Sequence, residues 1–367
     1  MKNKESIKKE IGLEFIKTIN DLKVKLIASR IDVSEHIPPP EIAWEIKEYD
    51  SDKFTILGTK GNISLVKGKA KSKKSFFINM AIASSISEGL LQNKFRSPTK
   101  EGFDRVLYFD TEQSKYHVQI AVKRVCRQIN IDVPKNLDSY GLRKYSPSER
   151  LDLIEYAIEN TPNLSFVVID GIRDLITSIN DETESSNVVS KLLKWSEVYN
   201  IHIIVVLHEN PGSDKARGHI GTELTNKAET VIAIQVDKSN DNISIVSAGF
   251  CRNKSFQSFA FEITEDGLPL ILEEYEVQSK SSKKVFDVLA LSPQDKFKIL
   301  EEVFKNSVNY MYSELVSQIK IILDLRYPGN KGKGQSKIKE LISESKDEGW
   351  ICQVGNRSPI ELGELSV

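Results

Sequence analysis

The sequence predicts an α/β fold built on a mostly parallel, twisted sheet, followed by a small separate domain at the C-terminal end. Short runs of apolar and β-branched residues alternate with helical patterns from about residue 54 onward. Several of these runs are almost continuously apolar, as are strands of a parallel sheet that helices cover on both faces. Residues 293–367 follow another order, in which helical patterns come first and a hairpin pattern comes last.

The composition indicates a globular protein of more than one domain. The chain has 367 residues, of which 40% are hydrophobic and 28% are charged. Its 51 basic and 52 acidic side chains nearly cancel, so a nucleic-acid partner would have to be held by a local patch. Three widely spaced cysteines argue against a disulfide framework, and no apolar run is long enough for a membrane span. We therefore expect a cytoplasmic protein with no membrane partner.

The N-terminal segment, residues 1–37, is expected to be helical over residues 4–30. A stiff spacer of three prolines, residues 38–40, ends the segment. Two alternatives remain open: the helix caps the core of its own chain, or it is a handle for a neighbouring subunit. The apolar residues recur every three or four positions, as on one face of a helix: Ile7, Ile11, Phe15, Ile16, Ile19, Leu22 and Leu26.

The main domain is predicted to span residues 38–277, and small polar and basic residues mark a linker at 278–292. Helical patterns separate the expected strands. These strands are Asn62–Val66, Arg105–Phe109, Phe166–Ile169, His202–Leu207, Val231–Gln235 and Ile243–Ala248.

A loop that resembles a phosphate-binding loop follows the first of these strands. In the pattern GxxxxGK[ST], backbone N–H groups and a helix N-terminus surround the phosphates, the lysine reaches the β and γ phosphates, and the hydroxyl holds Mg²⁺. Gly68, Lys74 and Ser75 match this pattern, but Lys73 stands in place of the second glycine. The alternative is a basic turn that contains these residues by chance. The predicted nucleotide-binding residues are Gly68, Lys69, Ala70, Lys71, Ser72, Lys73, Lys74, Ser75 and Phe76.

The neighbourhood of this loop is rich in lysine. No acidic residue lies between Phe54 and Ser87, so we expect the region to attract anions strongly. The lysines concerned are Lys60, Lys67, Lys69, Lys71, Lys73 and Lys74.

Two further apolar strands run directly into acidic residues. One run ends in Asp110-Thr-Glu112 and the other in Asp170. Ligands of an open α/β sheet bind beyond the carboxyl ends of its strands, where an aspartate can hold Mg²⁺ and a glutamate can activate water. The alternative is that such residues only begin turns. We assign Asp170 to the metal, together with Ser75, and Glu112 to water activation.

A third strand ends at His208, which would then face the same site. There the imidazole could contact the γ-phosphate and sense hydrolysis. The alternative is a histidine that only satisfies local hydrogen bonds.

Taken in order along residues 38–265, these motifs resemble those of the RecA-like ATPases. They are most similar to the RepA-type hexameric helicases and related AAA-type ATPases of mobile elements. The resemblance rests on Pro38–Pro40, the loop at 68–75, Leu107–Glu112, Val167–Asp170 and Val206–His208, and it continues through Arg217–Leu224. It implies a P-loop NTPase core that binds ATP and Mg²⁺, with Lys74, Ser75, Glu112, Asp170 and His208 in the roles given above.

The resemblance also implies a homo-oligomer, which is a hexamer in the RepA-type relatives. The loop at 209–219 would face the central channel or the next subunit. Arg252-Asn-Lys254 resembles the KNK stretch of RecA-type proteins, whose basic residues reach a neighbour's nucleotide. Arg252 and Lys254 are therefore candidates for catalysis in trans, and Arg217 is a rival for the same role. A solvated β-turn is the alternative for Arg252 and Lys254.

The last module, residues 293–367, is expected to be winged-helix-like. Helical patterns cover 294–305, 312–323 and 335–348, and a hairpin follows at 350–354 and 359–362. Basic residues gather where the recognition helix would begin, which favours DNA over a protein partner. The predicted DNA-binding residues are Lys331, Lys333, Gln335, Ser336, Lys337, Lys339 and Arg357.

These features favour an ATP-hydrolysing, oligomeric, DNA-associated ATPase, such as a helicase, loader or remodeller. The alternative, suggested by Lys73, is a regulatory or DNA-binding module that binds nucleotide but turns it over weakly. A small-molecule kinase is disfavoured because the sequence has no evident lid segment before Asp170.

Overall fold

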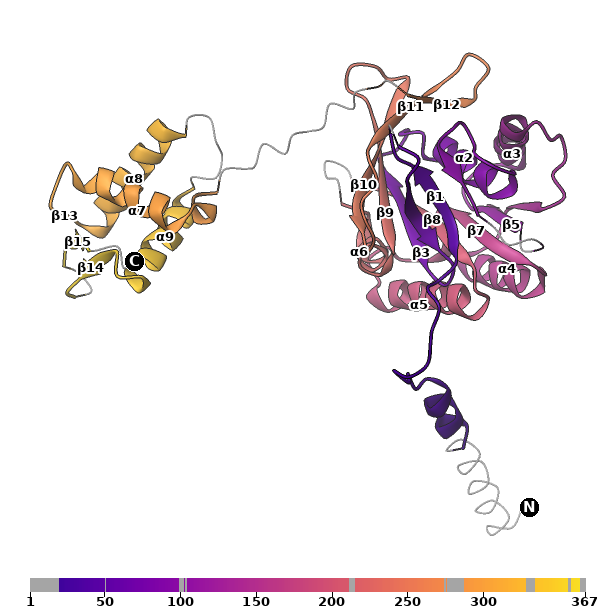
Figure 1. Cartoon of the computed structure of the whole chain (residues 1–367), viewed down its shortest axis with the longest axis horizontal. Coiled ribbons are helices and arrows are strands. Elements are labelled where there is room, and N and C mark those ends of the chain that lie inside the picture. Colours follow the sequence, from indigo (N-terminus) through magenta and orange to yellow (C-terminus); the bar gives the residue numbers. More distant parts are fainter. Residues whose placement is uncertain are drawn as a thin grey trace, which may run out of the picture. The chain divides into compact units, whose positions relative to one another are not determined.

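The computed structural model divides into two compact units, Met1–Tyr275 and Glu276–Val367 (Figure 1). It describes residues 20–49, 51–98, 102, 104–210, 215–273, 275, 287–327, 334–355 and 358–363. No helix among these residues is long and apolar enough to cross a membrane.

A nine-stranded sheet forms the centre of the first unit, in the order β12-β11-β10-β9-β3-β8-β7-β5-β6. Strands β9, β3, β8, β7, β5 and β6 are parallel neighbours, and β10, β11 and β12 extend the sheet with antiparallel pairs. The predicted α/β class with a mostly parallel sheet is confirmed. The strands are β3 (Ile63–Gly68), β5 (Arg105–Asp110), β6 (Leu137–Gly141), β7 (Leu164–Asp170), β8 (His202–His208), β9 (Thr230–Val236), β10 (Ile243–Cys251), β11 (Phe259–Ile263) and β12 (Pro269–Leu272).

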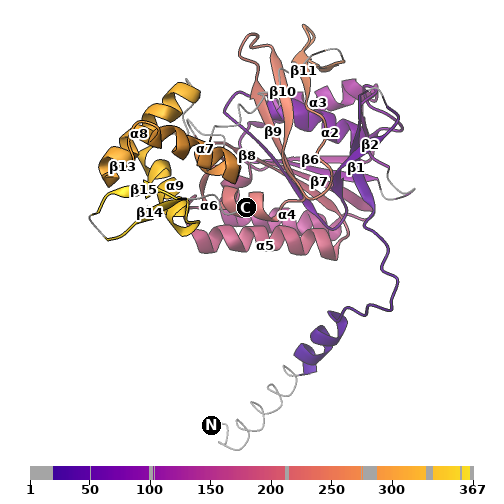
Figure 2. The same cartoon turned by 60° about the vertical axis from the view of Figure 1, so that its left-hand side comes forward.

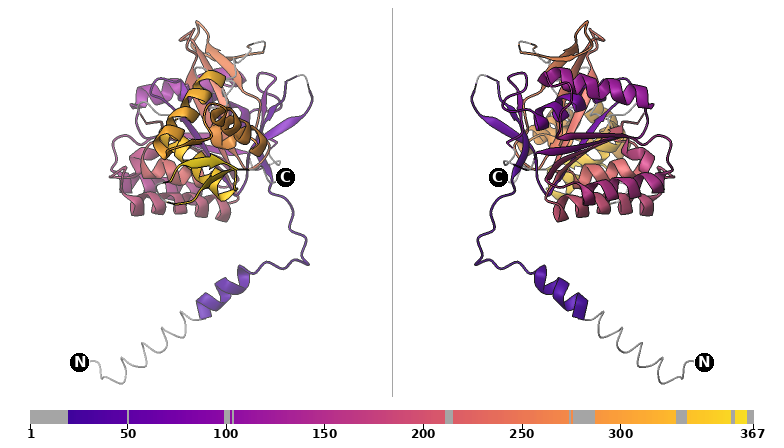
Figure 3. Two further views of the ribbon diagram at one scale, coloured as in Figure 1. Left: turned by 90° about the vertical axis from the view of Figure 1, so that its left-hand side faces the viewer. Right: turned by 90° about the vertical axis from the view of Figure 1, so that its right-hand side faces the viewer.

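Helices cover both faces of this sheet (Figures 2 and 3). Successive residues of a strand point to opposite faces, so Val66 of β3 packs in one hydrophobic core and Leu65 in the other. The first core contains residues of α2 (Lys74–Ile86) and α3 (Lys115–Ile129). The second contains residues of α4 (Pro147–Asn160), α5 (Glu182–Val198) and α6 (Gly218–Lys227).

Local sequence signals fix several helix ends. Ser146 caps α4 by accepting from the Glu149 N–H, the Glu149 side chain returns a contact to Ser146, and Pro147 occupies the first turn. Helix α3 ends at Asn130, which adopts a left-handed conformation with φ of 54°. The first residue of α4 and the last residue of α3 are therefore explained by their local sequences.

A second, three-stranded sheet in the order β2-β1-β4 lies against the first core. None of its three strands was predicted from the sequence: β1 (Ile42–Lys47), β2 (Phe54–Thr59) and β4 (Phe95–Arg96). Trp44 of β1 is fully buried, and its ring lies 6.0 Å from that of Phe77 and 6.1 Å from that of Phe166. This aromatic cluster joins the small sheet to α2 and β7.

The described part of the N-terminal segment is helical over residues 20–28. Leu22 and Leu26 are 61% and 75% exposed there, so these two residues do not cap the core of their own chain. The other residues of the predicted apolar stripe, Ile7 to Ile19, lie outside the described residues. The role of the helix as a handle for a neighbour remains a prediction.

Among its described residues, the second unit has three α-helices and a small sheet in the order β13-β15-β14. Its core includes Leu315, Ile338 and Trp350. Val288 is also fully buried in this core, so the predicted linker, 278–292, extends too far. The elements are α7 (Pro293–Phe304), β13 (Asn309–Tyr310), α8 (Tyr312–Arg326), α9 (Gln335–Asp347), β14 (Ile351–Gln353) and β15 (Ile360–Leu362), of which β13 was not indicated by the sequence.

Candidate functional site

The register of the parallel strands brings the predicted site residues to one edge of the sheet. Gly68 at the end of β3 is the Cα partner of His208 at the end of β8. Asp110 at the end of β5 is likewise the partner of Asp170 at the end of β7. These strand ends meet the loop that joins β3 to α2, which is the expected place for a ligand in an open α/β sheet.

Backbone geometry explains which loop positions accept side chains. A Cβ on Gly68 would lie 2.3 Å from the Ile234 carbonyl oxygen and 2.6 Å from Ser72 Oγ, so only glycine fits there. Lys71 and Lys73 both have φ of 64°, in the left-handed region that favours glycine. Lys73 therefore adopts the conformation that the missing second glycine would supply.

Lys74 is buried and directs its ammonium group toward three acceptors. Its Nζ donates to the carbonyl oxygens of Gly68 (3.0 Å) and Lys69 (2.9 Å) and lies 3.0 Å from Nδ1 of His208. Burial lowers the pKa of Lys74, and the nearby carboxylates of Asp170, Glu112 and Glu209 oppose that shift. A phosphate is a stronger electrostatic partner than these loop carbonyl oxygens and could replace them as the acceptor of the Lys74 ammonium.

His208 lies between Lys74 and Glu112. An ammonium group can only donate, so Nδ1 of His208 must accept, and the ring proton resides on Nε2. That Nε2 lies 3.8 Å from Glu112 Oε1. The facing imidazole, and then the Lys74 charge, lower the pKa of Glu112, so Glu112 is a carboxylate at neutral pH.

Ser75 and Asp170 lie side by side, with Ser75 Oγ donating to Asp170 Oδ2 over 2.9 Å. Burial and the Asp110 carboxylate raise the pKa of Asp170 to about 7. A hydroxyl and a carboxylate are hard oxygen ligands of the kind that Mg²⁺ prefers. A divalent cation would also offset the repulsion between Asp170 and the nearby carboxylates. Ser75 and Asp170 therefore have the oxygen donors that Mg²⁺ prefers, and their assignment to the metal stays a prediction.

Asp110 is a site residue whose importance the sequence analysis passed over in favour of Glu112. It is 1% exposed and accepts from the backbone N–H groups of Glu112 (3.0 Å) and Gln113 (2.7 Å). Its other oxygen accepts from the Gln113 side chain over 2.7 Å. Asp110 thus fixes the turn that presents Glu112. The available signal was its place as the last residue of the strand.

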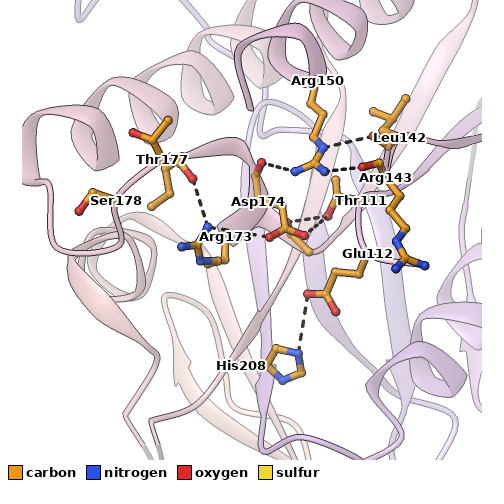
Figure 4. A network of polar contacts seen from close by, with 12 residues as sticks. Thr111, Glu112, Leu142, Arg143, Arg150, Arg173, Asp174, Thr177, Ser178 and His208 are labelled. Atoms are coloured by element: carbon orange, nitrogen blue, oxygen red, sulfur yellow. Dashed lines mark hydrogen bonds and ion pairs between the residues drawn. The ribbon is translucent and has the colours of Figure 1, made fainter. Parts of the chain in front are cut away.

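A network behind Glu112 joins two strand ends (Figure 4). The Thr111 hydroxyl lies within hydrogen-bond distance of two acceptors, Gly171 O (2.9 Å) and Asp174 Oδ2 (3.1 Å). Arg150 donates to the carbonyl oxygens of Asp174 (2.7 Å), Leu142 (3.2 Å) and Arg143 (2.9 Å). Thr111 thereby joins the end of β5 to the segment after β7, and Arg150 from α4 joins the segment after β6 to the same region.

These groups surround a cavity of about 480 Å³. Residues 71–76, Glu112, Asp170 and His208 line it, whereas Gly68, Lys69 and Ala70 lie outside its lining. The far wall, which the sequence analysis did not predict, comes from α3. The wall residues are His117, Ile120, Ala121 and Arg124, and the Arg124 guanidinium lies 3.9 Å from the centre of the Phe76 ring.

The turn between β9 and β10 holds the loop from one side. Lys73 Nζ donates to the Asp241 carbonyl oxygen, and Ser244 Oγ donates to Ser72 O over 3.3 Å. The Lys73 ammonium is thus directed to a backbone carbonyl.

The expectation that all six lysines near the loop attract an anion is wrong for two of them. Lys60 pairs with Glu41 over 2.8 Å, and Lys67 pairs with Glu209 over 3.1 Å. Both carboxylates lie outside the sequence window that was free of acids, so their contacts depend on the fold.

Two of the three candidates for catalysis in trans lie away from this site. Cys251, at the end of β10, is paired with Thr230, at the start of β9, so Arg252 and Lys254 lie at the opposite edge of the sheet. Arg252 donates to Lys227 O over 2.8 Å, and Lys254 pairs with Glu48 over 2.5 Å. Arg217 is exposed at the start of α6, and its N–H donates to His208 O over 3.0 Å. Of the loop at 209–219, residues 211–214 lie outside the described residues.

The predicted DNA-binding residues belong to the second unit. Gln335, Ser336 and Lys339 are exposed in the first turns of α9, and Lys337 pairs with Asp287 over 2.6 Å. Lys331, Lys333 and Arg357 lie outside the described residues.

Comparisons with known proteins place this geometry in a family. No curated protein matches the chain. Among solved structures, the crystal structure of the RadB recombinase is 15% identical, with a TM-score of 0.41 over 57% of this chain and 90% of that one. The model of a family described as an AAA domain matches residues 25–214, which is more than half of the chain and includes the loop at 68–75, Glu112, Asp170 and His208. The chain belongs to this AAA domain family.

Proposed function

We propose that the chain is a RecA-like ATPase of the RepA type that hydrolyses ATP, works as an oligomer and acts on DNA. The observation that carries the hydrolytic part is the continuous contact from Lys74 through His208 to Glu112, beside the Ser75–Asp170 pair. A phosphate-binding cation, a metal-binding pair and a carboxylate base thus face one cavity.

Each residue has a role that follows from its contacts. Lys74 exchanges loop carbonyls for phosphate oxygens when nucleotide binds. Mg²⁺ held by Ser75 and Asp170 would neutralise charge on the phosphates. Glu112 accepts the proton of the attacking water. His208 contacts Lys74 through Nδ1 and faces Glu112 through Nε2. A movement of Lys74 toward a bound phosphate would therefore also change the position of His208 beside the base, Glu112.

The test of hydrolysis compares Glu112→Gln with Glu182→Gln, an exposed glutamate in the first turn of α5. We expect Glu112→Gln to lower turnover about 10²- to 10⁴-fold while nucleotide affinity is kept. The control should match the wild type. Unchanged turnover in Glu112→Gln would refute its role as the base, and negligible turnover in the wild type would favour the weak-turnover alternative.

The DNA part of the proposal rests on the second unit. Its order of helices and strands, with α9 after α8 and a β14–β15 hairpin, is compatible with a winged helix. Exposed Gln335, Ser336 and Lys339 at the start of α9 are suited to base and phosphate contacts.

DNA binding is tested by the salt dependence of affinity. Lys339→Ala should weaken binding and reduce the slope of log K against log salt by about 1. Lys346→Ala, at the other end of the same helix, is the control and should leave the slope unchanged. ATPase rates with single- and double-stranded DNA, together with mass from light scattering, test DNA stimulation and oligomerisation. Salt-insensitive binding with no DNA stimulation would refute the DNA-associated function.

Catalysis in trans is tested by mixing two inactive variants. Arg252 and Lys254 lie too far from their own loop to act in cis, being at the opposite sheet edge. If they act on a neighbour, Lys74→Ala mixed with Arg252→Ala should recover part of the activity that each lacks alone. The same mixture with Arg217→Ala tests the rival residue, and no recovery in either mixture would refute trans catalysis.

A further inference from the structure

The turn before β4 is held in an unusual conformation. Gln92 and Asn93 have φ of 46° and 52°, in the left-handed region that side chains with a Cβ rarely adopt. The Gln92 side chain ties the turn to β12, because it donates to Pro269 O (2.9 Å) and accepts from the Ile271 N–H (2.9 Å). The surrounding structure therefore maintains this strained turn.

The residue after the turn, Lys94, is a buried cation. It is 5% exposed, which is close to the 4% of Lys60. Lys60 has the ion pair with Glu41, whereas the Lys94 ammonium makes no hydrogen bond or ion pair with any residue that the structure describes. Its ammonium lies 3.4 Å from the centre of the Tyr49 ring and 5.7 Å from that of Phe259. Burial lowers the pKa of Lys94 to about 8, so it remains charged at neutral pH.

A second buried polar group accompanies it. The Tyr49 hydroxyl is inaccessible to solvent and has no hydrogen-bond partner among the described residues. Both side chains line a cavity of about 490 Å³, which shares no residue with the cavity at the phosphate loop. A buried charge without an acceptor is costly, and an acceptor in the cavity would satisfy the Lys94 ammonium.

The other charges of this cavity define the ligand. Lys47 pairs with Asp52 over 3.1 Å, and Glu48 pairs with Lys254 over 2.5 Å. Among the described lining residues, the remaining charges are the cation Lys94 and the exposed carboxylate of Glu273, whose charge opposes the lowering of the Lys94 pKa. With these two pairs neutral, one cation and one carboxylate are left, so a ligand with one negative and one positive group matches the described lining better than a phosphate dianion.

We propose that this cavity binds a small zwitterion of the amino-acid class. Its carboxylate accepts from the Lys94 ammonium, and its ammonium group lies toward Glu273. The volume is in the range of ordinary small-ligand sites. The proposal is independent of ATP hydrolysis, since it uses none of the residues at the phosphate loop.

The test uses the full chain and the matched variants Lys94→Met and Lys60→Met. The free protein amino acids are the probes, with acetate and inorganic phosphate as comparators. Thermal unfolding and the rate at which an amine-reactive reagent labels Lys94, read by peptide mass spectrometry, are measured. At about ten times its dissociation constant, a bound amino acid should slow labelling about tenfold and raise Tm in the wild type. Lys94→Met should show no ligand-dependent rise in Tm.

The variants without ligand give a second readout. Lys94→Met removes an unpaired buried charge, so its Tm should equal or exceed that of the wild type, while Lys60→Met, which breaks an ion pair, should unfold earlier. The proposal is overturned if no amino acid protects Lys94, or if acetate or phosphate protects it equally well. It is also overturned if Lys94→Met loses as much stability as Lys60→Met, since Lys94 would then be a structural residue.

Discussion

The lysine in place of a loop glycine allows a quantitative test of how the phosphate loop is held. Lys73 contributes in two ways: its backbone lies at φ of 64°, and its ammonium donates to Asp241 O. Replacement by alanine removes only the hydrogen bond to Asp241 O. Replacement by glycine removes this hydrogen bond and also the steric strain of a Cβ at a positive φ. The pair Lys73→Ala and Lys73→Gly therefore separates conformation from tether.

The expected free energies of unfolding follow from these two effects. A left-handed residue with a Cβ costs about 1–2 kcal/mol, and glycine loses about 0.4–1 kcal/mol through the entropy of the unfolded chain. Lys73→Gly should thus be about 0.5–1 kcal/mol more stable than Lys73→Ala. Loss of a hydrogen bond at this half-exposed side chain costs about 1 kcal/mol. Lys73→Ala should therefore fall below the wild type, and Lys73→Gly should lie within about 0.5 kcal/mol of it.

The assay is urea unfolding followed by tryptophan fluorescence in a Trp350→Phe background. The remaining tryptophans, Trp44 and Trp195, both report the first unit. Equal stability of the two variants, or a more stable alanine variant, would refute the left-handed assignment. Because the Lys73 ammonium donates to the Asp241 carbonyl oxygen, neither variant should change nucleotide affinity much. A loss of about tenfold in both variants would instead mean that Lys73 contacts the nucleotide.

Three further predictions concern the same edge of the sheet. Gly68→Ala should destabilise the first unit and abolish nucleotide binding in a filter assay, since its Cβ would lie 2.3 Å from Ile234 O; wild-type affinity would contradict the close approach. Arg150→Met should destabilise the first unit by about 1–2 kcal/mol in urea unfolding, because three carbonyls, of which that of Leu142 belongs to a buried residue, lose a charged donor; a change below about 0.5 kcal/mol would show that Arg150 does not hold the segments after β6 and β7 together. Asp170 has a pKa of about 7 and must be deprotonated to bind a cation, so Mg²⁺ affinity by calorimetry should fall about tenfold per pH unit below 7; affinity that is constant from pH 5 to 7 would speak against this residue as the ligand.

The sequence predicted those parts of the fold that depend on local pattern. Strands β3, β5, β7 and β8 are continuously buried, so their apolar runs were evident, and each ends in a residue of the candidate site. Because parallel strands in one sheet end at the same edge, the meeting of Asp170 with Ser75 followed from chain order alone.

Other parts could not be predicted because they depend on contacts between distant residues. Strand β6, Leu137–Gly141, lies at the sheet edge and has mixed, half-exposed residues without a period of two. The partner of Lys67 is 142 residues away in sequence. Arg150 reaches the β7 end from α4, and Lys94 becomes buried only when β4 pairs with β1. No local pattern signals these placements.

Strand β10 reaches both edges of the sheet. It begins beside the phosphate loop, where Ser244 meets Ser72, and it ends at Cys251, directly before Arg252. Its nine residues span about 30 Å, and backbone ladders to β9 and β11 stiffen it. One continuous strand therefore connects the Arg252–Lys254 segment to the phosphate loop, so a second copy that docked at one edge of the sheet would contact an element that reaches the other edge.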